Sequence, residues 1–229
     1  MNLYKIRMVL KHNKFIYGVY ENIRNKSEMK KRVILKENGF DIISNIEHVL
    51  NDTDFLYFIT FGSLLGLIRE GDLISHDIDI DYAIIMDNKF KWENLESLFL
   101  KNGFKKIRQF SFDGEIREQT YKIDGLTIDF FGCKNSSDKT CSLDFYRKHN
   151  YSYKDKSEMH VREDRYYKIL STKKKTFKNV TVTIPDNPEK YLESIYSSSW
   201  RVPIVDWDPS NAPNIYELDK LGTKDLFIE

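Results

Sequence analysis

Three aspartates at alternate positions, Asp77, Asp79 and Asp81, are the residues whose type and spacing point most directly to chemistry. On a β-strand their side chains would project from one face, while Ile78 and Ile80 would project from the other. Carboxylates roughly 6–7 Å apart in a partly buried site repel one another unless a cation or raised pKa values relieve the repulsion. A divalent cation relieves it most simply, and magnesium prefers such oxygen ligands. The pattern therefore predicts a site for Mg²⁺ (or Mn²⁺).

Two other interpretations of the aspartates compete with a magnesium site. A calcium-binding loop is excluded, because the sixth position counted from Asp77 is Tyr82 instead of glycine and the twelfth is Asn88 instead of glutamate. The other alternative is an exposed edge strand with solvated aspartates. Asp is depleted in strands, however, and the apolar residues 83–85 that follow indicate a buried strand.

Two further features fit a site that binds phosphate and metal. Gly62 and Ser63 lie between a predicted strand and a predicted helix, where glycine permits close backbone approach and free helix amides can hold a phosphate. Asp129 is the one acid in the apolar run 126–131. An isolated acid of this kind is usually paired, metal-bound or catalytic, and a surface-facing side chain is the alternative.

The order of these features is that of the nucleotidyltransferase fold: a Gly-Ser turn, aspartates on the next strand, and one aspartate on a later strand. More closely, the segment FGSLLGLIREGDLI at 61–74, followed by HDIDID at 76–81, resembles the LicD and fukutin family of phosphotransferases. A C-terminal pattern is also similar to that family, and the resemblance covers about residues 30–204. This pattern comprises Ile184-Pro185, a helix with Tyr191 and Leu192, and then Tyr196, Trp200 and Pro203.

The resemblance implies an α+β fold, a nucleotidyltransferase-like mixed β-sheet flanked by helices. It assigns the metal ligands to Asp79 and Asp81, the third carboxylate to Asp129, and the phosphate-cradling turn to Gly62 and Ser63.

Three residues around this centre are assigned less directly. Arg69 matches an arginine after the short helix and would contact a phosphate, with a surface arginine as the alternative. Asp77 matches the first acid of the family's run and would orient a ligand or a water. His76 would touch a phosphate, relay a proton or make a structural hydrogen bond. The sequence departs from the family where Ser75-His76 replace Pro-Trp and where residues 197–199 replace a glycine, which affects donor and acceptor details.

The resemblance also implies the reaction. It is the transfer of a phosphocholine or phosphoalditol group from a CDP-activated donor to a hydroxyl of a glycan or lipid-linked saccharide, as in capsule or lipopolysaccharide biosynthesis. Asp129 is the first choice for the group that takes the proton of the acceptor hydroxyl. One alternative is a nucleotidyltransferase that moves NMP from an NTP to a small molecule, protein or RNA. The other is a catalytically silent member that only binds a nucleotide or glycan.

Composition sets outer limits on these functions. The 229 residues are 41% hydrophobic with five prolines, which excludes a disordered or fibrous chain. A net charge of +1 predicts no nucleic acid partner. The longest uncharged run, 55–68, is 14 residues, shorter than the roughly 20 that span a bilayer. We therefore expect a cytoplasmic enzyme, in which the basic and aromatic N-terminus packs on the core or rests peripherally on the inner face of the membrane.

The elements that must position these residues form one catalytic domain, 1–229, with a core at about 27–204. A helix at 27–50, weakened or split at Gly39, leads into a strand at 55–60. Two Asp-Gly turns predict an antiparallel extension, and Asn187-Pro188 a helix start. Residues 133–164 are expected to be a polar insertion of loops with a short helix, and 205–229 an irregular tail. The remaining predicted elements are a helix at 64–68, strands at 77–86, 104–112, 115–123 and 126–131, a helix at 92–102, strands at 166–171 and 176–184 around a Lys173–Lys175 turn, and a helix to Tyr196.

Overall fold

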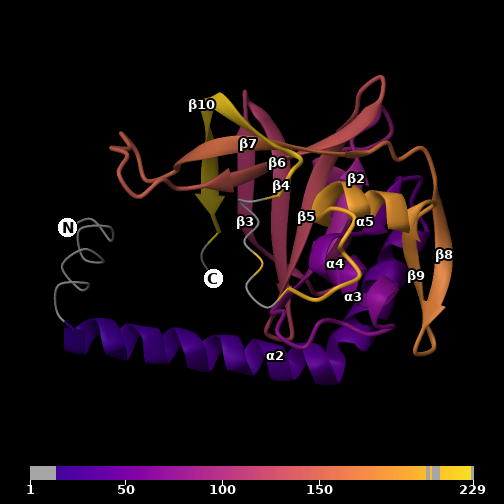
Figure 1. The fold of residues 1–229 in the computed structure, drawn as a ribbon, viewed down its shortest axis with the longest axis horizontal. Helices are drawn as coiled ribbons and strands as arrows, with labels where there is room; N and C mark the ends of the chain where they lie inside the picture. The colour runs from indigo at the N-terminus through magenta and orange to yellow at the C-terminus, as the bar shows by residue number, and fades with distance from the viewer. Residues whose placement is uncertain (1–13, 205–206, 208–211, 228–229) are drawn as a thin grey trace.

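The structure, a computed structural model, describes residues 14–204, 207 and 212–227 and is α+β, as predicted (Figure 1). A mixed eight-stranded sheet is flanked by helices and accompanied by a two-stranded sheet. The elements in chain order are α2 (Lys14–Asn51), β1 (Tyr57–Ile59), α3 (Phe61–Arg69), β2 (Asp79–Ile85), α4 (Trp92–Lys101), β3 (Lys105–Phe112), β4 (Glu115–Ile123), β5 (Leu126–Asn135), β6 (Lys139–Tyr146), β7 (Glu158–Tyr167), β8 (Thr172–Phe177), β9 (Val180–Pro185), α5 (Pro188–Tyr196) and β10 (Ile215–Leu226).

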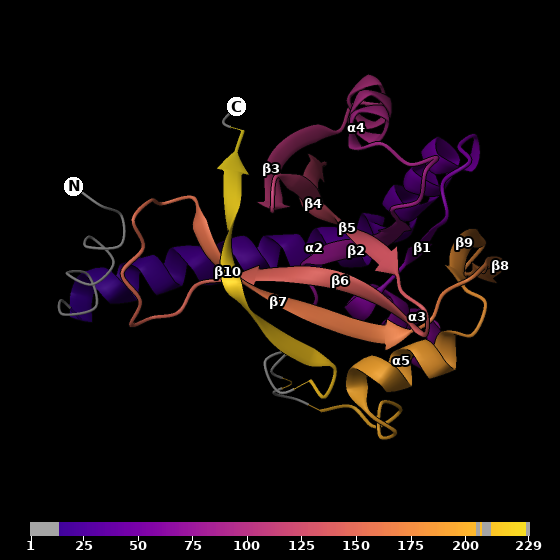
Figure 2. The same ribbon diagram turned by 90° about the horizontal axis from the view of Figure 1, so that it is seen from above.

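The large sheet has the order β1-β2-β5-β4-β3-β10-β7-β6. Only the β2–β5 pair is parallel among these pairings. The end of β5 also pairs with β6, so the strands β5, β4, β3, β10, β7 and β6 form a closed ring of pairings. Figures 1 and 2 show β10 between β3 and β7, which joins the two halves of this ring.

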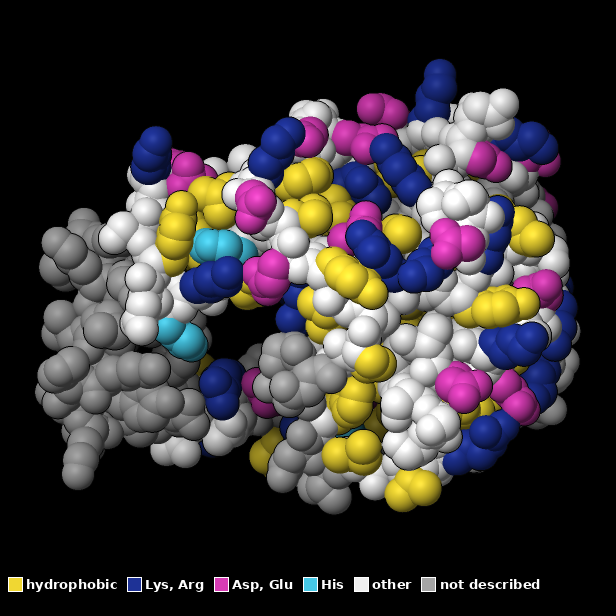
Figure 3. Space-filling view, turned by 45° about the horizontal axis from the view of Figure 1, so that its top comes forward, with side chains coloured by type: hydrophobic (Ala, Val, Ile, Leu, Met, Phe, Trp, Pro, Cys, Tyr) yellow, Lys and Arg dark blue, Asp and Glu magenta, His cyan; other side chains and the backbone are white. Residues whose placement is uncertain are grey.

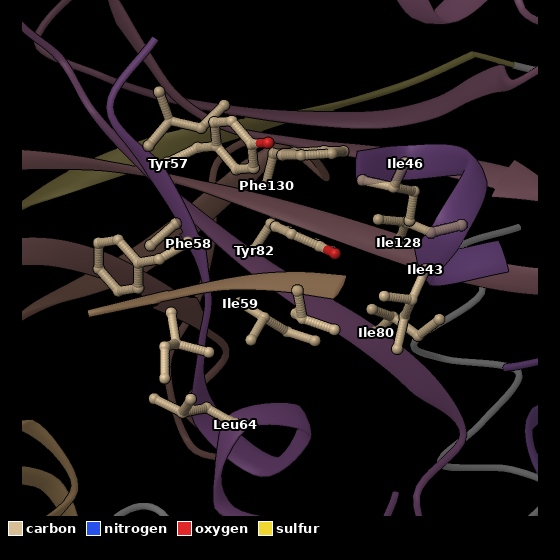
Figure 4. Close-up of a cluster of buried hydrophobic side chains, with 14 of the residues drawn as sticks. Ile43, Ile46, Tyr57, Phe58, Ile59, Leu64, Ile80, Tyr82, Ile128 and Phe130 are labelled. Carbon is tan, nitrogen blue, oxygen red and sulfur yellow. The ribbon is translucent and has the colours of Figure 1, made fainter. Parts of the chain in front are cut away.

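The main core lies between α2 and one face of the sheet. Ile43 and Ile46 of α2 pack with Tyr82 of β2 and with Ile128 and Phe130 of β5 (Figure 4). Because successive strand residues point to opposite faces, the aspartates between these core positions project from the other face. The apolar alternation of β2 and β5 thus fixes the face on which the acidic site is built.

A buried glutamate ties α2 to three strands. The Glu47 carboxylate accepts hydrogen bonds from the hydroxyls of Tyr57 and Tyr82, at 3.1 Å each. It also accepts bonds from the amide and hydroxyl of Thr183, at 2.9 and 2.6 Å. Four donors satisfy this buried carboxylate, so the network fixes how α2 sits on β1, β2 and β9.

Helix α2 passes through Gly39 without a break, so the glycine does not split it. A Cβ at Gly39 would lie 2.6 Å from Leu73 Cδ1, so glycine allows the close approach of the chain that follows α3. The basic N-terminal segment lies largely outside the described residues. Within the described part of the chain, no helix is both long and apolar enough to cross a membrane.

The predicted antiparallel extension is confirmed as β3, β4 and β5. Its two tight turns have positive φ at both central residues, 51° and 78° at Asp113-Gly114 and 49° and 87° at Asp124-Gly125. This is the geometry of the two-residue hairpin turns that Asp-Gly favours. The start of α5 is confirmed as well, with the Asn187 side chain accepting from the Lys190 amide.

The expectation for 133–164 was wrong, because most of this segment is strand. Residues 139–146 and 158–167 form β6 and β7. Some of their polar side chains are buried and hydrogen-bonded, such as Ser142 with Tyr166 at 2.6 Å, and most of the others are half-buried. Their apolar residues join a second small core, made of Phe110, Leu143, Phe145, Met159 and Val161.

Two further expectations also need correction. The tail predicted to be irregular contains β10, which is held by backbone pairing to strands on both sides although most of its side chains are exposed or half-buried. Lys173–Lys175 lie within β8 and not in a turn. The turn falls at Lys178-Asn179, where both φ values are positive.

Candidate metal centre

Three carboxylates meet on the sheet face opposite the main core. The parallel register of β2 and β5 places Asp81 directly beside Asp129. Asp79 precedes Asp81 by two positions and therefore projects from the same face. One carboxylate oxygen from each of the three lies within 4.8 Å of the others. The structure thus brings together the three residues that the sequence marked as metal ligands.

Burial and mutual repulsion dominate the electrostatics of this centre. Burial, together with the charges of Asp129 and Asp77, raises the pKa of Asp79 to about 6. Burial also raises the pKa of Asp81 well above its usual range, and Asp79 and Asp129 add to that shift. Three converging acids that repel one another in a partly dehydrated place are a donor set for a hard divalent cation. The residues present therefore fit Mg²⁺ or Mn²⁺.

Asp129 is held by two donors from neighbouring strands. Both the Thr120 hydroxyl and the Arg108 guanidinium donate to Asp129 Oδ1, the arginine at 3.0 Å. Arg108 Nε donates in addition to Thr120 Oγ1 at 2.9 Å. The Oδ1 atom is thus occupied, which leaves Oδ2 for a metal or a substrate hydroxyl. Neither Arg108 nor Thr120 is among the site residues predicted from the sequence.

The Gly62-Ser63 turn forms the beginning of α3 beside this centre. Ser63 is buried, and its Oγ accepts a hydrogen bond from the Asp81 amide at 3.1 Å. The Thr60 amide donates to the Asp81 carbonyl at 2.9 Å, which fixes the helix start against β2. The side chain of the N-cap residue, Thr60, makes no capping hydrogen bond to this helix. The backbone amides of its first turn therefore remain as donors for an anion, and the Ser63 hydroxyl, which accepts from the Asp81 amide, still has its own proton to donate.

Asp77 lies just before β2, against Gly62. A Cβ at Gly62 would lie 2.7 Å from Asp77 Oδ2, so only glycine fits without displacing that carboxylate. Burial raises the pKa of Asp77, and the charges of His76 and Arg69 oppose this rise. The exposed His76 and the half-buried Arg69 thus flank Asp77 at the rim of the centre. Arg69 binds the neighbouring Glu70 carboxylate through Nε at 3.0 Å and a terminal nitrogen at 2.5 Å.

Two more residues near the centre had no assigned role. Burial raises the pKa of the Tyr196 phenol, and Asp81 and Asp77 add to this, so the hydroxyl at the end of α5 lies in the field of the acids. Tyr196 stood in the C-terminal pattern of the resemblance, which is the one signal for it. Lys31 of α2 donates to Thr127 Oγ1 at 3.3 Å, and its charge opposes the burial-driven rise in the pKa of Asp79. No local pattern marks Lys31.

A surface cavity lies apart from the acidic centre. A cavity of about 590 Å³ lies between β7, α5 and β10, and none of the predicted site residues lines it. On the face drawn in Figure 3, basic and acidic side chains are interspersed, without a large patch of one sign. This distribution agrees with the balanced net charge of the chain.

Comparisons with known proteins place the chain in a family. The family model described as LicD/FKTN/FKRP, nucleotidyltransferase domain, matches residues 54–187. These residues are more than half of the chain and include every site residue predicted from the sequence. A comparison with curated proteins finds no match. The chain belongs to the LicD/FKTN/FKRP family, and this membership indicates a transferase of the phosphotransferase type.

Proposed function

We propose that the chain moves a phospho-alcohol group, of the phosphocholine or phosphoalditol type, from a CDP-activated donor to a hydroxyl of a cell-surface glycan or related acceptor. The observation that carries the proposal is the convergence of Asp79, Asp81 and Asp129 within 4.8 Å in a member of this family. These three side chains would hold Mg²⁺ or Mn²⁺. When bound, the cation would neutralise the charge that develops on the donor phosphates.

The residues around the acidic centre would bind and orient the donor. The uncapped amides of Gly62 and Ser63 at the start of α3 face developing negative charge with the positive end of a helix. Arg69, whose Nε and one terminal nitrogen now both donate to Glu70 Oε1, would turn these donors to two oxygens of a phosphate. Asp77 and His76 would orient this arginine or an ordered water at the rim.

The proton of the acceptor hydroxyl would pass to Asp129. Thr120 and Arg108 occupy its Oδ1, so Oδ2 is the atom that would accept the proton. The acceptor oxygen forms a bond to the donor phosphorus as the bond to the CMP leaving group breaks, and CMP departs with that electron pair. The buried Thr120 and the half-buried Arg108, which already hold Asp129, keep its geometry constant during this exchange.

The kind of acceptor determines the place in the cell where the proposed reaction occurs. A glycan assembled on a lipid carrier would bring the reaction to a membrane surface, so we propose a cytoplasmic enzyme that contacts the inner face of the membrane peripherally. The N-terminal segment, with Lys5, Arg7, Lys11 and Lys14, is the region proposed for that contact.

A second candidate is transfer of NMP from an NTP, because the matching family model is described as a nucleotidyltransferase domain. The products separate the two reactions: a CDP-donor phosphotransferase releases CMP, and a nucleotidyltransferase releases pyrophosphate. The test is to incubate the protein and Mg²⁺ with CDP-linked alcohols or with NTPs and to quantify both products, with Asp81→Asn as the inactive control. CMP release that requires the intact centre supports the proposal. Pyrophosphate release, or no turnover of any donor, contradicts it.

A further inference from the structure

Lys224 of β10 is a half-buried cation without a counter-ion. Among the residues that the structure describes, its ammonium has no hydrogen-bond or ion-pair partner. Burial lowers the pKa of Lys224, and the charges of Arg108 and Arg147 lower it further. An unpaired charge that is partly removed from water and faces two like charges is unfavourable. A bound anion would supply the missing counter-charge.

The strand register connects Lys224 to the metal centre. Lys224 lies opposite Phe110 of β3, and Leu226 lies opposite Arg108, so Lys224 and Arg108 are diagonal neighbours on one face. Arg108 in turn lies opposite Thr120, and Thr120 lies opposite Asp129. This row places Lys224 on the same face of the sheet as the acidic centre. Three strand spacings, about 14 Å, separate its backbone from that of Asp129.

The two arginines retain capacity for an anion. Arg108 is 35% exposed and uses Nε and one terminal nitrogen for Thr120 and Asp129, which leaves the other terminal nitrogen without a described partner. Arg147 donates one bond to the Asp155 carbonyl at 3.3 Å and stacks on the Tyr153 ring at 4.2 Å. The planar guanidinium groups of Arg108 and Arg147 have the donor geometry that binds phosphate or carboxylate oxygens.

We propose that Lys224, together with Arg108 and Arg147, binds a phosphate or carboxylate group of the acceptor. Because three strand spacings separate the backbone of Lys224 from that of Asp129, an anion held at Lys224 would be a different group from the one next to the three aspartates. The assignment of this anion to the acceptor rests on the proposed function, whereas the anion site itself does not. Arg108 and Arg147 lie within residues 54–187, whereas Lys224 lies outside them, so the site joins the segment that the family model matches to β10.

The test titrates inorganic phosphate into the metal-free, full-length protein by calorimetry. We expect the wild-type protein to bind phosphate, Lys224→Gln to weaken binding about tenfold or more, and Lys224→Arg to retain it. The matched control is Lys220→Gln, which removes an exposed lysine of the same strand that is paired with Asp113 at 3.0 Å, and it should leave phosphate affinity unchanged. Absence of wild-type binding, wild-type affinity in Lys224→Gln, or equal losses in both glutamine variants would overturn the site.

Two further measurements locate the anion and check the fold. In the presence of Mn²⁺, Lys224→Gln should leave the affinity for CDP unchanged. A loss of CDP affinity as large as that for phosphate would assign the anion to the donor and overturn the acceptor assignment. Lys224→Gln should also raise the melting temperature of the phosphate-free protein, because it removes an unpaired charge, and a lower value would overturn the claim that Lys224 has no structural partner. Asp81→Asn should keep phosphate binding without metal, so a failure of the proposed transfer would not be mistaken for a failure of this site.

Discussion

Asp81 and Asp129 are register partners in the one parallel pair among the described strands of the large sheet, although a helix and two strands separate them in the sequence. This single pairing creates the acidic centre, because Asp79 follows from the alternation of β2 and lies on the same face. The antiparallel partner on the other side of Asp129 is Thr120, which supplies a hydrogen bond to it. Strand register therefore determines both which aspartate lies beside Asp81 and which hydroxyl donates to Asp129.

The Thr120 hydroxyl should matter for metal binding through Asp129. Thr120→Val keeps the shape but removes the donor to Asp129 Oδ1, and we expect Mn²⁺ affinity to fall about 10–100-fold. Thr120→Ser keeps the hydroxyl and should stay near the wild-type value. Paramagnetic resonance of free Mn²⁺ measures both variants. Equal affinities in Val and Ser would show that the bond does not position Asp129.

Gly62→Ala should act through Asp77. The added Cβ would lie 2.7 Å from Asp77 Oδ2, so the carboxylate must shift, and we expect a loss of about 1–3 kcal/mol in the free energy of unfolding. In an Asp77→Ala background the same change should be nearly neutral, since the clashing atom is absent. Urea denaturation of the double-mutant cycle measures this coupling. Additive effects would place the cause of the loss elsewhere.

The Glu47 network should serve stability and not the site. Glu47→Ala leaves the hydroxyls of Tyr57, Tyr82 and Thr183 buried without their acceptor, and we expect a loss of about 3 kcal/mol in the free energy of unfolding. The folded fraction should keep wild-type Mn²⁺ affinity, because Glu47 lies on the core side of the sheet. Chemical denaturation and Mn²⁺ titration of the same sample check both statements. A stable variant with weakened metal binding would contradict the assignment.

Asp164 should make stability depend on pH. Burial, with a contribution from Asp144, raises its pKa from 3.8 to about 7. Between these values the folded state binds more protons than the unfolded state, so this group's contribution to stability falls as pH rises from about 4 to about 7 and is constant above that range. Asp164→Asn removes the effect. Its stability relative to wild type should therefore increase from pH 4 to pH 8, by as much as about 4 kcal/mol.

The measurement for Asp164 is the free energy of unfolding of both proteins across this pH range. The exposed Asp138→Asn is the control and should show a flat difference. A flat difference for Asp164→Asn, or one that decreases toward pH 8, would mean that the carboxyl is not disfavoured in its charged form.

The hairpin part of the site could be predicted from the sequence, and the rest could not. A two-residue turn at Asp124-Gly125 sets Ile123 opposite Leu126, and counting back along both strands gives Thr120 opposite Asp129. The position of Arg108 cannot be counted in the same way from the Asp113-Gly114 turn. A register shift between Phe110 and Ser111 moves its pairing partner on β4 by one residue. Without this irregularity Arg108 would lie opposite Gln119 and point to the other face, away from Asp129.

The strands that complete the sheet were missed for a different reason. β6, β7 and β10 carry many charged and hydroxyl side chains, so they lack the apolar alternation that marks β2 or β5. Their pairing partners lie far away in the sequence, and a local pattern cannot reveal them. The parallel β2–β5 register also pairs strands that are far apart in the sequence. The convergence of its aspartates could therefore be predicted only from the family resemblance.

The most direct test of the central claim is a calorimetric or paramagnetic titration of Mn²⁺ into the wild-type protein, Asp81→Asn and the exposed control Asp113→Asn. We expect specific Mn²⁺ binding by the wild type and the control, and at least a tenfold loss in Asp81→Asn, which removes a proposed ligand and also the charge that Asp79 and Asp129 repel. Asp81→Asn should meanwhile remain folded, with a melting temperature equal to or above that of the wild type. Binding of Mn²⁺ by Asp81→Asn with wild-type affinity, or no binding by the wild type, would contradict the claim that these aspartates form a metal centre.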